Sequence, residues 1–144
     1  MNRRVPIAPL LALALAAAGC GGADPDEFTE RYAGATAPLE TIFTDIGDLE
    51  PEAAGAEYDA IAADFDDVKE RLAALEAPDG AQDELEAVVT ALGGYAEKVR
   101  QLANAAKADD LDALDTAVKG LESAGDSWLG AEEQLIIAVA AAES

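Results

Sequence analysis

Large apolar residues recur along most of this chain at alternating intervals of three and four, with polar residues between them. This interval is typical of one face of an α-helix. The pattern is interrupted at three polar segments, "DLEPEAAGAE", "APDGAQ" and "KADDLD". No alternation of period two, which would indicate β-strands, extends over a useful length. The pattern therefore predicts an all-α protein with four helices.

The first helix is expected over Asp24–Gly47 and the second over Pro51–Ala77. Asp24 is a suitable N-cap, and Pro25 suits the first helical position. Pro38 lacks an N–H and its ring meets the previous turn, so we expect a kink or a break there. The apolar stripe of the first helix comprises Phe28, Tyr32, Leu39, Ile42, Ile46 and Leu49, with Ala35 filling a gap, and that of the second comprises Tyr58, Ile61, Phe65, Val68, Leu72 and Leu75.

The third helix is expected over Asp79–Lys107. Asp79 is a suitable N-cap, and Gln82 three residues later completes a variant of the capping box. Gly93 and Gly94 fall at the middle, where each costs up to about 1 kcal/mol relative to alanine. They indicate either a close approach between helices or a local bend. The apolar stripe comprises Leu85, Val88, Leu92, Tyr95, Val99 and Leu102.

The fourth helix is expected to begin near Asp109 or Asp110 and to continue through a weak point at Gly125. Its stripe comprises Leu111, Leu114, Val118, Leu121, Ala124, Trp128, Ala131 and Leu135, and Ile136, Ile137 and Val139 widen the apolar face near the C-terminus. Four amphipathic helices joined by short turns predict an antiparallel up-down-up-down four-helix bundle over residues 25–144.

The first twenty residues have a different pattern: "MNRR" is positively charged, "VPIAPLLALALAA" is apolar and "AAGC" is small. This order predicts an export signal, because the apolar run is shorter than the about 20 residues of a membrane span. "AAGC", residues 17–20, resembles the lipobox of bacterial lipoproteins. The resemblance implies cleavage between Gly19 and Cys20, and a diacylglyceryl group on the Cys20 thiol. The expected organisation is a signal peptide over 1–19, a lipidated cysteine and linker over 20–24, and the helical bundle over 25–144.

A second cleavage site is also present, because Ala16–Ala18 satisfies the small-x-small rule of ordinary secretion. That product would be secreted, would begin at Gly19 and would carry a free thiol. Cys20 is the only cysteine, so it has no partner for an internal disulfide. The lipoprotein interpretation is favoured, since it gives this thiol a role. It locates the protein on the extracytoplasmic face of the cell membrane, and the "GGAD" linker, at most about 14 Å long, keeps the helices close to the bilayer.

Composition narrows the classes of function. The formal net charge is −21, which opposes binding to nucleic acids because that binding relies on cationic side chains. The chain has no histidine, so it lacks the usual general base near neutral pH, the commonest metal ligand and the proximal ligand of haem. Ser123, Ser127 and Ser144 have no histidine or evident lysine partner for nucleophilic catalysis. We therefore expect no enzyme activity and no cofactor.

Two acidic segments, "DFDDVKERLAAL" from Asp64 and "DDLDALDTAVKG" from Asp109, lack the glycine and the final glutamate of a calcium-binding EF-hand loop. Weak binding of Ca²⁺ or Mg²⁺ stays open, but solvated helix faces are the favoured interpretation. The residues concerned are Asp64, Asp66, Asp67 and Glu70 in one cluster, and Asp109, Asp110, Asp112 and Asp115 in the other.

The sequence thus predicts an acidic, lipid-anchored helical bundle with a binding or scaffolding role in the cell envelope and no catalysis. Its expected partners are the membrane, through Cys20, and an envelope protein or a second copy, because heptad-like stripes can pair between chains. The alternative is a secreted or anchored module that binds divalent cations weakly or binds a small ligand. A pocket for that ligand is expected near Pro38, Gly93, Gly94 and Trp128, although Trp128 and the three tyrosines are expected to pack in the core.

Overall fold

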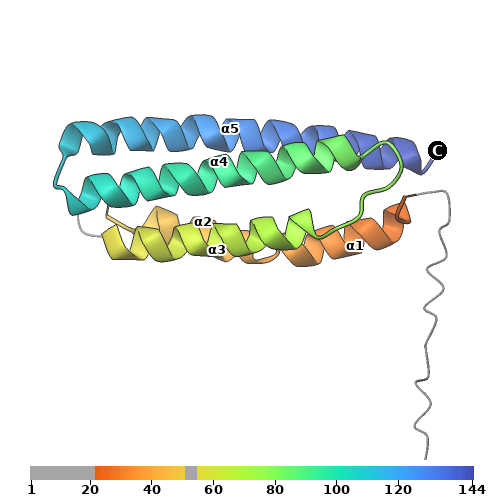
Figure 1. Ribbon diagram of the computed structural model, residues 1–144, viewed down its shortest axis with the longest axis horizontal. Helices are drawn as coiled ribbons and strands as arrows, with labels where there is room; N and C mark the ends of the chain where they lie inside the picture. The colour runs from red at the N-terminus through yellow and green to blue at the C-terminus, as the bar shows by residue number, and fades with distance from the viewer. Residues whose placement is uncertain (1–21, 51–54) are drawn as a thin grey trace, which may run out of the picture.

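The computed structural model of the chain describes residues 22–50 and 55–144, and within these ranges it contains α-helices and no β-strand (Figure 1). The helices are α1 (Pro25–Thr36), α2 (Pro38–Asp48), α3 (Gly55–Ala73), α4 (Gln82–Lys107) and α5 (Leu111–Ala142). The prediction of an all-α protein is confirmed. None of the described helices combines the length and the apolar character that crossing a membrane requires.

The helices lie along a common long axis (Figure 1). Helix α4 packs along both α3 and α5, whereas α1 and α2 follow one another along α3, and α1 also contacts α5. Helices α1, α2 and α4 run in one direction, and α3 and α5 run in the other. The start of α1, the connection between α3 and α4, and the end of α5 therefore lie at the same end of the molecule.

The predicted start and break of the first helix are both confirmed. The Asp24 side chain accepts hydrogen bonds from the backbone N–H groups of Asp26 and Glu27, at 3.0 and 3.1 Å. Helix α1 ends at Thr36 and α2 begins at Pro38, because a proline supplies no N–H to continue the ladder. The α-helical backbone of Ala37 joins the two helices without a wide turn.

The predicted boundary between the second and third helices is wrong by several residues. Helix α3 ends at Ala73 rather than Ala77, and α4 begins at Gln82 rather than Asp79. Gly80 has φ +83°, a left-handed conformation that no right-handed helix contains. Asp79 is not the N-cap, and the Gln82 side chain instead accepts a hydrogen bond from the Ala77 N–H at 3.3 Å. The predicted start at Pro51 lies outside the described residues.

Helix α5 begins and continues as predicted. The Asp110 side chain caps it by accepting a hydrogen bond from the Ala113 N–H at 3.0 Å, and the helix passes through Gly125 without interruption. Helix α4 likewise passes through Gly93 and Gly94. A Cβ at Gly93 would meet only the flexible Lys69 side chain, at 3.3 Å, and one at Gly94 would meet nothing. These glycines therefore do not mark a close approach between helix backbones, and α4 continues through them without a break.

The core follows the predicted stripes closely in α3 and α4 and less closely in α5. Phe65, Leu72 and Leu92 are fully buried, as the stripes predict. In α5, Leu114 and Leu121 are buried, but Leu111 is 66% exposed and Val118 is 38% exposed. The buried large apolar residues are Phe28, Leu39, Ile42, Tyr58, Ile61, Phe65, Val68, Leu72, Leu85, Val88, Leu92, Tyr95, Val99, Leu102, Leu114, Leu121, Leu135 and Val139.

Candidate functional site

The predicted processing residues, Gly19 and Cys20, lie outside the described residues, but the linker that follows them is bound to the helical domain. The Gly22 N–H donates a hydrogen bond to Asp79 Oδ1 at 2.7 Å, and the Ala23 N–H donates one to the Ala77 carbonyl at 3.2 Å. A Cβ at Gly22 would lie 2.6 Å from the Ala77 oxygen, which is closer than real side chains come. Only glycine allows this contact, so the linker is held against the α3–α4 connection.

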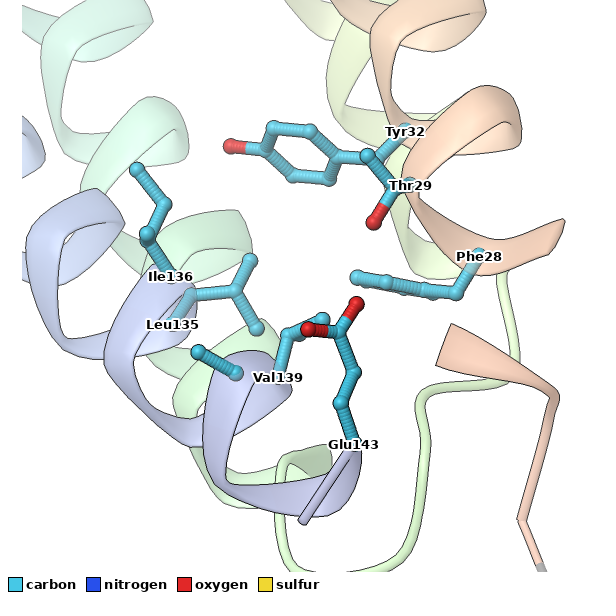
Figure 2. A pocket seen from close by; sticks show the side chains of 8 residues that line it. Phe28, Thr29, Tyr32, Leu135, Ile136, Val139 and Glu143 are labelled. Atoms are coloured by element: carbon cyan, nitrogen blue, oxygen red, sulfur yellow. The ribbon is translucent and has the colours of Figure 1, made fainter. Parts of the chain in front are cut away.

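A first apolar depression, of about 220 Å³, lies between α1 and the C-terminal turns of α5. We call it the α1 depression. Figure 2 shows Phe28 and Tyr32 of α1 facing Leu135 and Val139 of α5, with Glu143 at the end of the helix. Its lining residues are Phe28, Thr29, Tyr32, Leu135, Ile136, Val139, Ala140 and Glu143. It lies at the end of the molecule where α1 starts and α5 ends (Figure 1).

A second apolar depression, of about 330 Å³, contains aromatic side chains from three helices, and we call it the Trp128 depression. The Phe43 ring centroid lies 5.5 Å from those of Phe65, Tyr95 and Trp128. Trp128 is half-buried, and within the described part of the chain its indole Nε1 has no hydrogen-bond partner. The lining residues are Phe43, Ile46, Tyr95, Val118, Leu121, Glu122, Gly125, Trp128 and Leu129.

The structure separates the residues predicted to surround a pocket. Trp128 lines the Trp128 depression, whereas Pro38 lines a different surface hollow together with Asp45, Asp64 and Arg71. Gly93 and Gly94 line neither hollow. The aromatic depression therefore forms where α5 faces α2, and the predicted four positions do not come together.

Helices α1 and α5 are also joined by a polar contact near the α1 depression. The Tyr32 hydroxyl donates a hydrogen bond to Glu132 Oε1 at 3.0 Å. Burial of the phenol and the neighbouring Glu132 carboxylate raise the pKa of Tyr32 above its usual range. This hydrogen bond joins α1 to α5 through Tyr32, which also lines the depression.

Burial also raises the pKa values of Tyr58 and Tyr95, so all three tyrosines favour the protonated state in the folded chain. The unfolded chain releases these protons above about pH 10. We therefore expect the tyrosine contribution to the free energy of unfolding to stay constant below about pH 10. Above that pH the contribution should fall, because the unfolded chain loses these protons more readily than the folded chain. Urea unfolding at a series of alkaline pH values measures this slope.

Tyr58→Phe tests the cause of that slope, because Tyr58 is buried and burial alone raises its pKa. The variant should retain the core and show a shallower alkaline loss of stability than the wild-type chain. An unchanged slope would show that ionisation of Tyr58 does not contribute to the alkaline unfolding.

Three of the eight acidic residues in the two predicted cation clusters make separate local contacts. Asp66 pairs with Arg100 across α3 and α4, and Asp110 caps α5. Asp115 Oδ2 lies 2.5 Å from Lys119 Nζ within α5. Among the residues that the structure describes, no group of three or more cysteine, aspartate or glutamate side chains converges on a metal-binding position.

Comparisons of the chain with protein-family models, with curated proteins and with solved structures found no match. The site is therefore interpreted from its own geometry. Sequence reasoning included Ile136 in a widened apolar face but did not find the exposed position of Leu129, because periodicity identifies a face of a helix without showing whether another element covers it.

Proposed function

We propose that this chain is an acidic lipoprotein, held on the extracytoplasmic face of a bacterial cell membrane through a lipid on Cys20, whose helical domain binds or scaffolds another envelope component. The proposal assigns it no catalysis. The observation that carries the binding role is the pair of apolar depressions along α5, since surface hollows with aromatic walls are typical of binding sites.

The docked linker supports the anchoring part of the proposal. Gly22 is bound to Asp79, and only one residue separates it from Cys20 in the sequence, so the two are at most about 7 Å apart. A lipid on Cys20 would hold the bilayer next to the end of the molecule that contains the α3–α4 connection and the α1 depression. The proposed binding surface would then extend away from the membrane along α5.

We also propose that the helices constitute an up-down-up-down four-helix bundle in which α1 and α2 together form the first helix. The alternating chain directions and the packing of α4 between α3 and α5 support this arrangement. The break at Ala37 is the expected effect of Pro38 on a helix that otherwise continues. In this arrangement both depressions lie at the junction of the first and fourth helices.

The anchor is tested with the full chain expressed in a bacterium that lipidates proteins, followed by fractionation and intact-mass measurement. We expect a membrane species that begins at Cys20 and is heavier by the lipid. Cys20→Ser should abolish the added mass, because a serine hydroxyl does not replace the thiol in this modification. Ala23→Ser is the matched control, since it leaves "AAGC" intact. A soluble wild-type species that begins at Gly19 without added mass would overturn the anchor.

A second candidate function is the binding of a small apolar ligand in the Trp128 depression. The depression favours it through its three aromatic residues, Phe43, Tyr95 and Trp128. Titration with a neutral apolar dye such as Nile red tests this candidate. Saturable binding that quenches or shifts Trp128 fluorescence supports it, and the absence of binding contradicts it.

A further inference from the structure

All the large apolar residues that are exposed in the described chain belong to α5: Leu111, Val118, Leu129, Ile136 and Ile137. Leu111, Leu129 and Ile136 are 66%, 57% and 62% exposed, values more typical of charged surface residues. An amphipathic helix that packs in a single bundle should direct such side chains inward. This concentration on one helix indicates a surface that another element covers.

Four of these residues lie on one line along the helix, and we call them the α5 seam: Leu111, Val118, Leu129 and Ile136. At 3.6 residues per turn, their positions differ by no more than about 20° around the helix axis, while Ile137 lies about 100° from Ile136. The seam is about 37 Å long, which is the length of a helix of about 25 residues. The spacing is that of a contact with a partner helix lying lengthwise.

The α5 seam is continuous with the two depressions. Val118 and Leu129 line the Trp128 depression, and Ile136 lines the α1 depression. Figure 2 shows Ile136 on the same turn of α5 as Leu135, which faces α1. A helix lying on the seam would therefore also contact residues of α1 and α2, and would enter a shallow groove rather than rest on a flat face.

The charges beside the α5 seam are negative. Glu122 and Glu143 line the depressions, and Asp126 and Glu133 are exposed on the flank of the seam. Helices α1, α2 and α5 contain only two basic residues, Arg31 and Lys119. Both already pair within their own helices, Arg31 with Glu27 at 2.6 Å and Lys119 with Asp115 at 2.5 Å. Lys119 also lies near Glu122, so these helices set one cation beside the four flanking carboxylates, and the flank keeps an excess of negative charge.

We infer that the α5 seam is the docking surface for a basic amphipathic helix of a partner protein. An apolar stripe on such a helix fits the seam, and its lysines or arginines meet the flanking carboxylates. A second copy of this chain would bring the same carboxylates together, which opposes pairing of two α5 seams. The inference deepens the proposed binding role and does not depend on the lipid anchor.

The probe is a synthetic peptide of about 25 residues, built from leucine and lysine with the leucines on one helical stripe. Titration into the mature chain, residues 20–144 with Cys20→Ser, is followed by the fluorescence of Trp128. Trp128 is the only tryptophan in the chain and lies in the Trp128 depression beside the seam, and the peptide contains none. A peptide of the same composition in scrambled order measures attraction by charge alone.

We expect one peptide to bind per chain, with a shift in Trp128 emission, and the scrambled peptide to bind at least about tenfold more weakly. Leu129→Ser with Ile136→Ser should weaken binding by about tenfold or more, because two buried aliphatic contacts are lost. Ile137→Ser is the matched control and should change the affinity by less than about twofold, since it removes an exposed isoleucine away from the seam. Circular dichroism of each variant should show unchanged helix content.

Equal binding of the ordered and scrambled peptides would overturn the inference, as would equal losses for the seam variant and Ile137→Ser. A wild-type chain that dimerises through the seam in sedimentation measurements would assign the seam to a second copy instead. If the ordered peptide does not bind, titration with Nile red shows whether the seam binds any apolar ligand. Seam-dependent dye binding without peptide binding would keep the seam as an apolar binding surface and reject the basic helix, whereas binding of neither probe would reject the seam as a binding surface.

Discussion

Replacing Phe65 with alanine is expected to lower the free energy of unfolding by about 3 to 5 kcal/mol. The Phe65 side chain of α3 is 0% exposed, and its ring centroid lies 5.5 Å from that of Phe43 and 4.9 Å from that of Tyr95. Truncation therefore removes contacts to α2 and α4 together and leaves a cavity between three helices. Domains of this size are stable by only about 5 to 15 kcal/mol, so the variant should lose a large part of that margin.

Urea unfolding followed by circular dichroism measures this loss. Leu111→Ala is the matched control, because it truncates a large apolar residue that is 66% exposed, and it should change stability by no more than about 0.5 kcal/mol. Similar midpoints for the two variants would contradict the role of Phe65 at the centre of the core. A lower slope of unfolding in Phe65→Ala would show that the substitution also alters the compactness of the native or the denatured state, or that unfolding is no longer two-state.

The parts of the fold that sequence reasoning predicted correctly depend on local signals. Asp24 followed by Pro25 predicts the start of α1 because both preferences act within one turn. Pro38 predicts the break after α1 for the same reason. Asp110 caps α5. The helix continues through Gly125 because one glycine destabilises a helix by less than the packing of the apolar stripe on α4 stabilises it.

The connection between α3 and α4 was beyond local reasoning because distant residues bind its polar groups. Asp79 has the chemistry of an N-cap, yet its carboxylate accepts the N–H of Gly22, which is far away in the sequence. Gln82 completes a capping motif in the sequence, yet it accepts the N–H of Ala77. A pattern in one segment does not show which other segment competes for its hydrogen bonds.

The candidate site was only partly predictable for a related reason. Of the four positions expected around a pocket, Trp128 alone lines the Trp128 depression. The exposed α5 seam depends on how little of α5 the α1 and α2 helices cover. The same three-four spacing places Leu114 in the core and Leu111 in solvent. Periodicity assigns residues to a face, and only the packing of the neighbouring helices decides which part of that face is left for a partner.

Gly22→Ala is expected to release the linker from the helical domain and to lower stability by about 1 to 2 kcal/mol. An alanine Cβ would lie 2.6 Å from the Ala77 oxygen and 2.6 Å from the Asp79 nitrogen. These are backbone atoms, which do not move aside as the end of a flexible side chain does. Residue 22 must therefore leave the connection, and its hydrogen bond to Asp79 is lost with it.

Gly34→Ala is the matched control, and it is expected to change the free energy of unfolding in the opposite direction. Gly34 lies within α1 with nothing within 4 Å of an added Cβ, so alanine should raise stability by up to about 1 kcal/mol through its greater helix propensity. A rise in stability for both variants would contradict the docked linker.

A double-mutant cycle with Asp79→Ala identifies the contact responsible for the loss in Gly22→Ala. If Gly22→Ala acts by breaking the bond to Asp79, the second substitution should cost much less in the Gly22→Ala background than alone. Full additivity would instead assign the loss to steric displacement of the connection. A coupled result would show that the residue two positions after Cys20 is held by a specific contact, which is the property that a short anchor needs in order to orient the helices relative to a membrane.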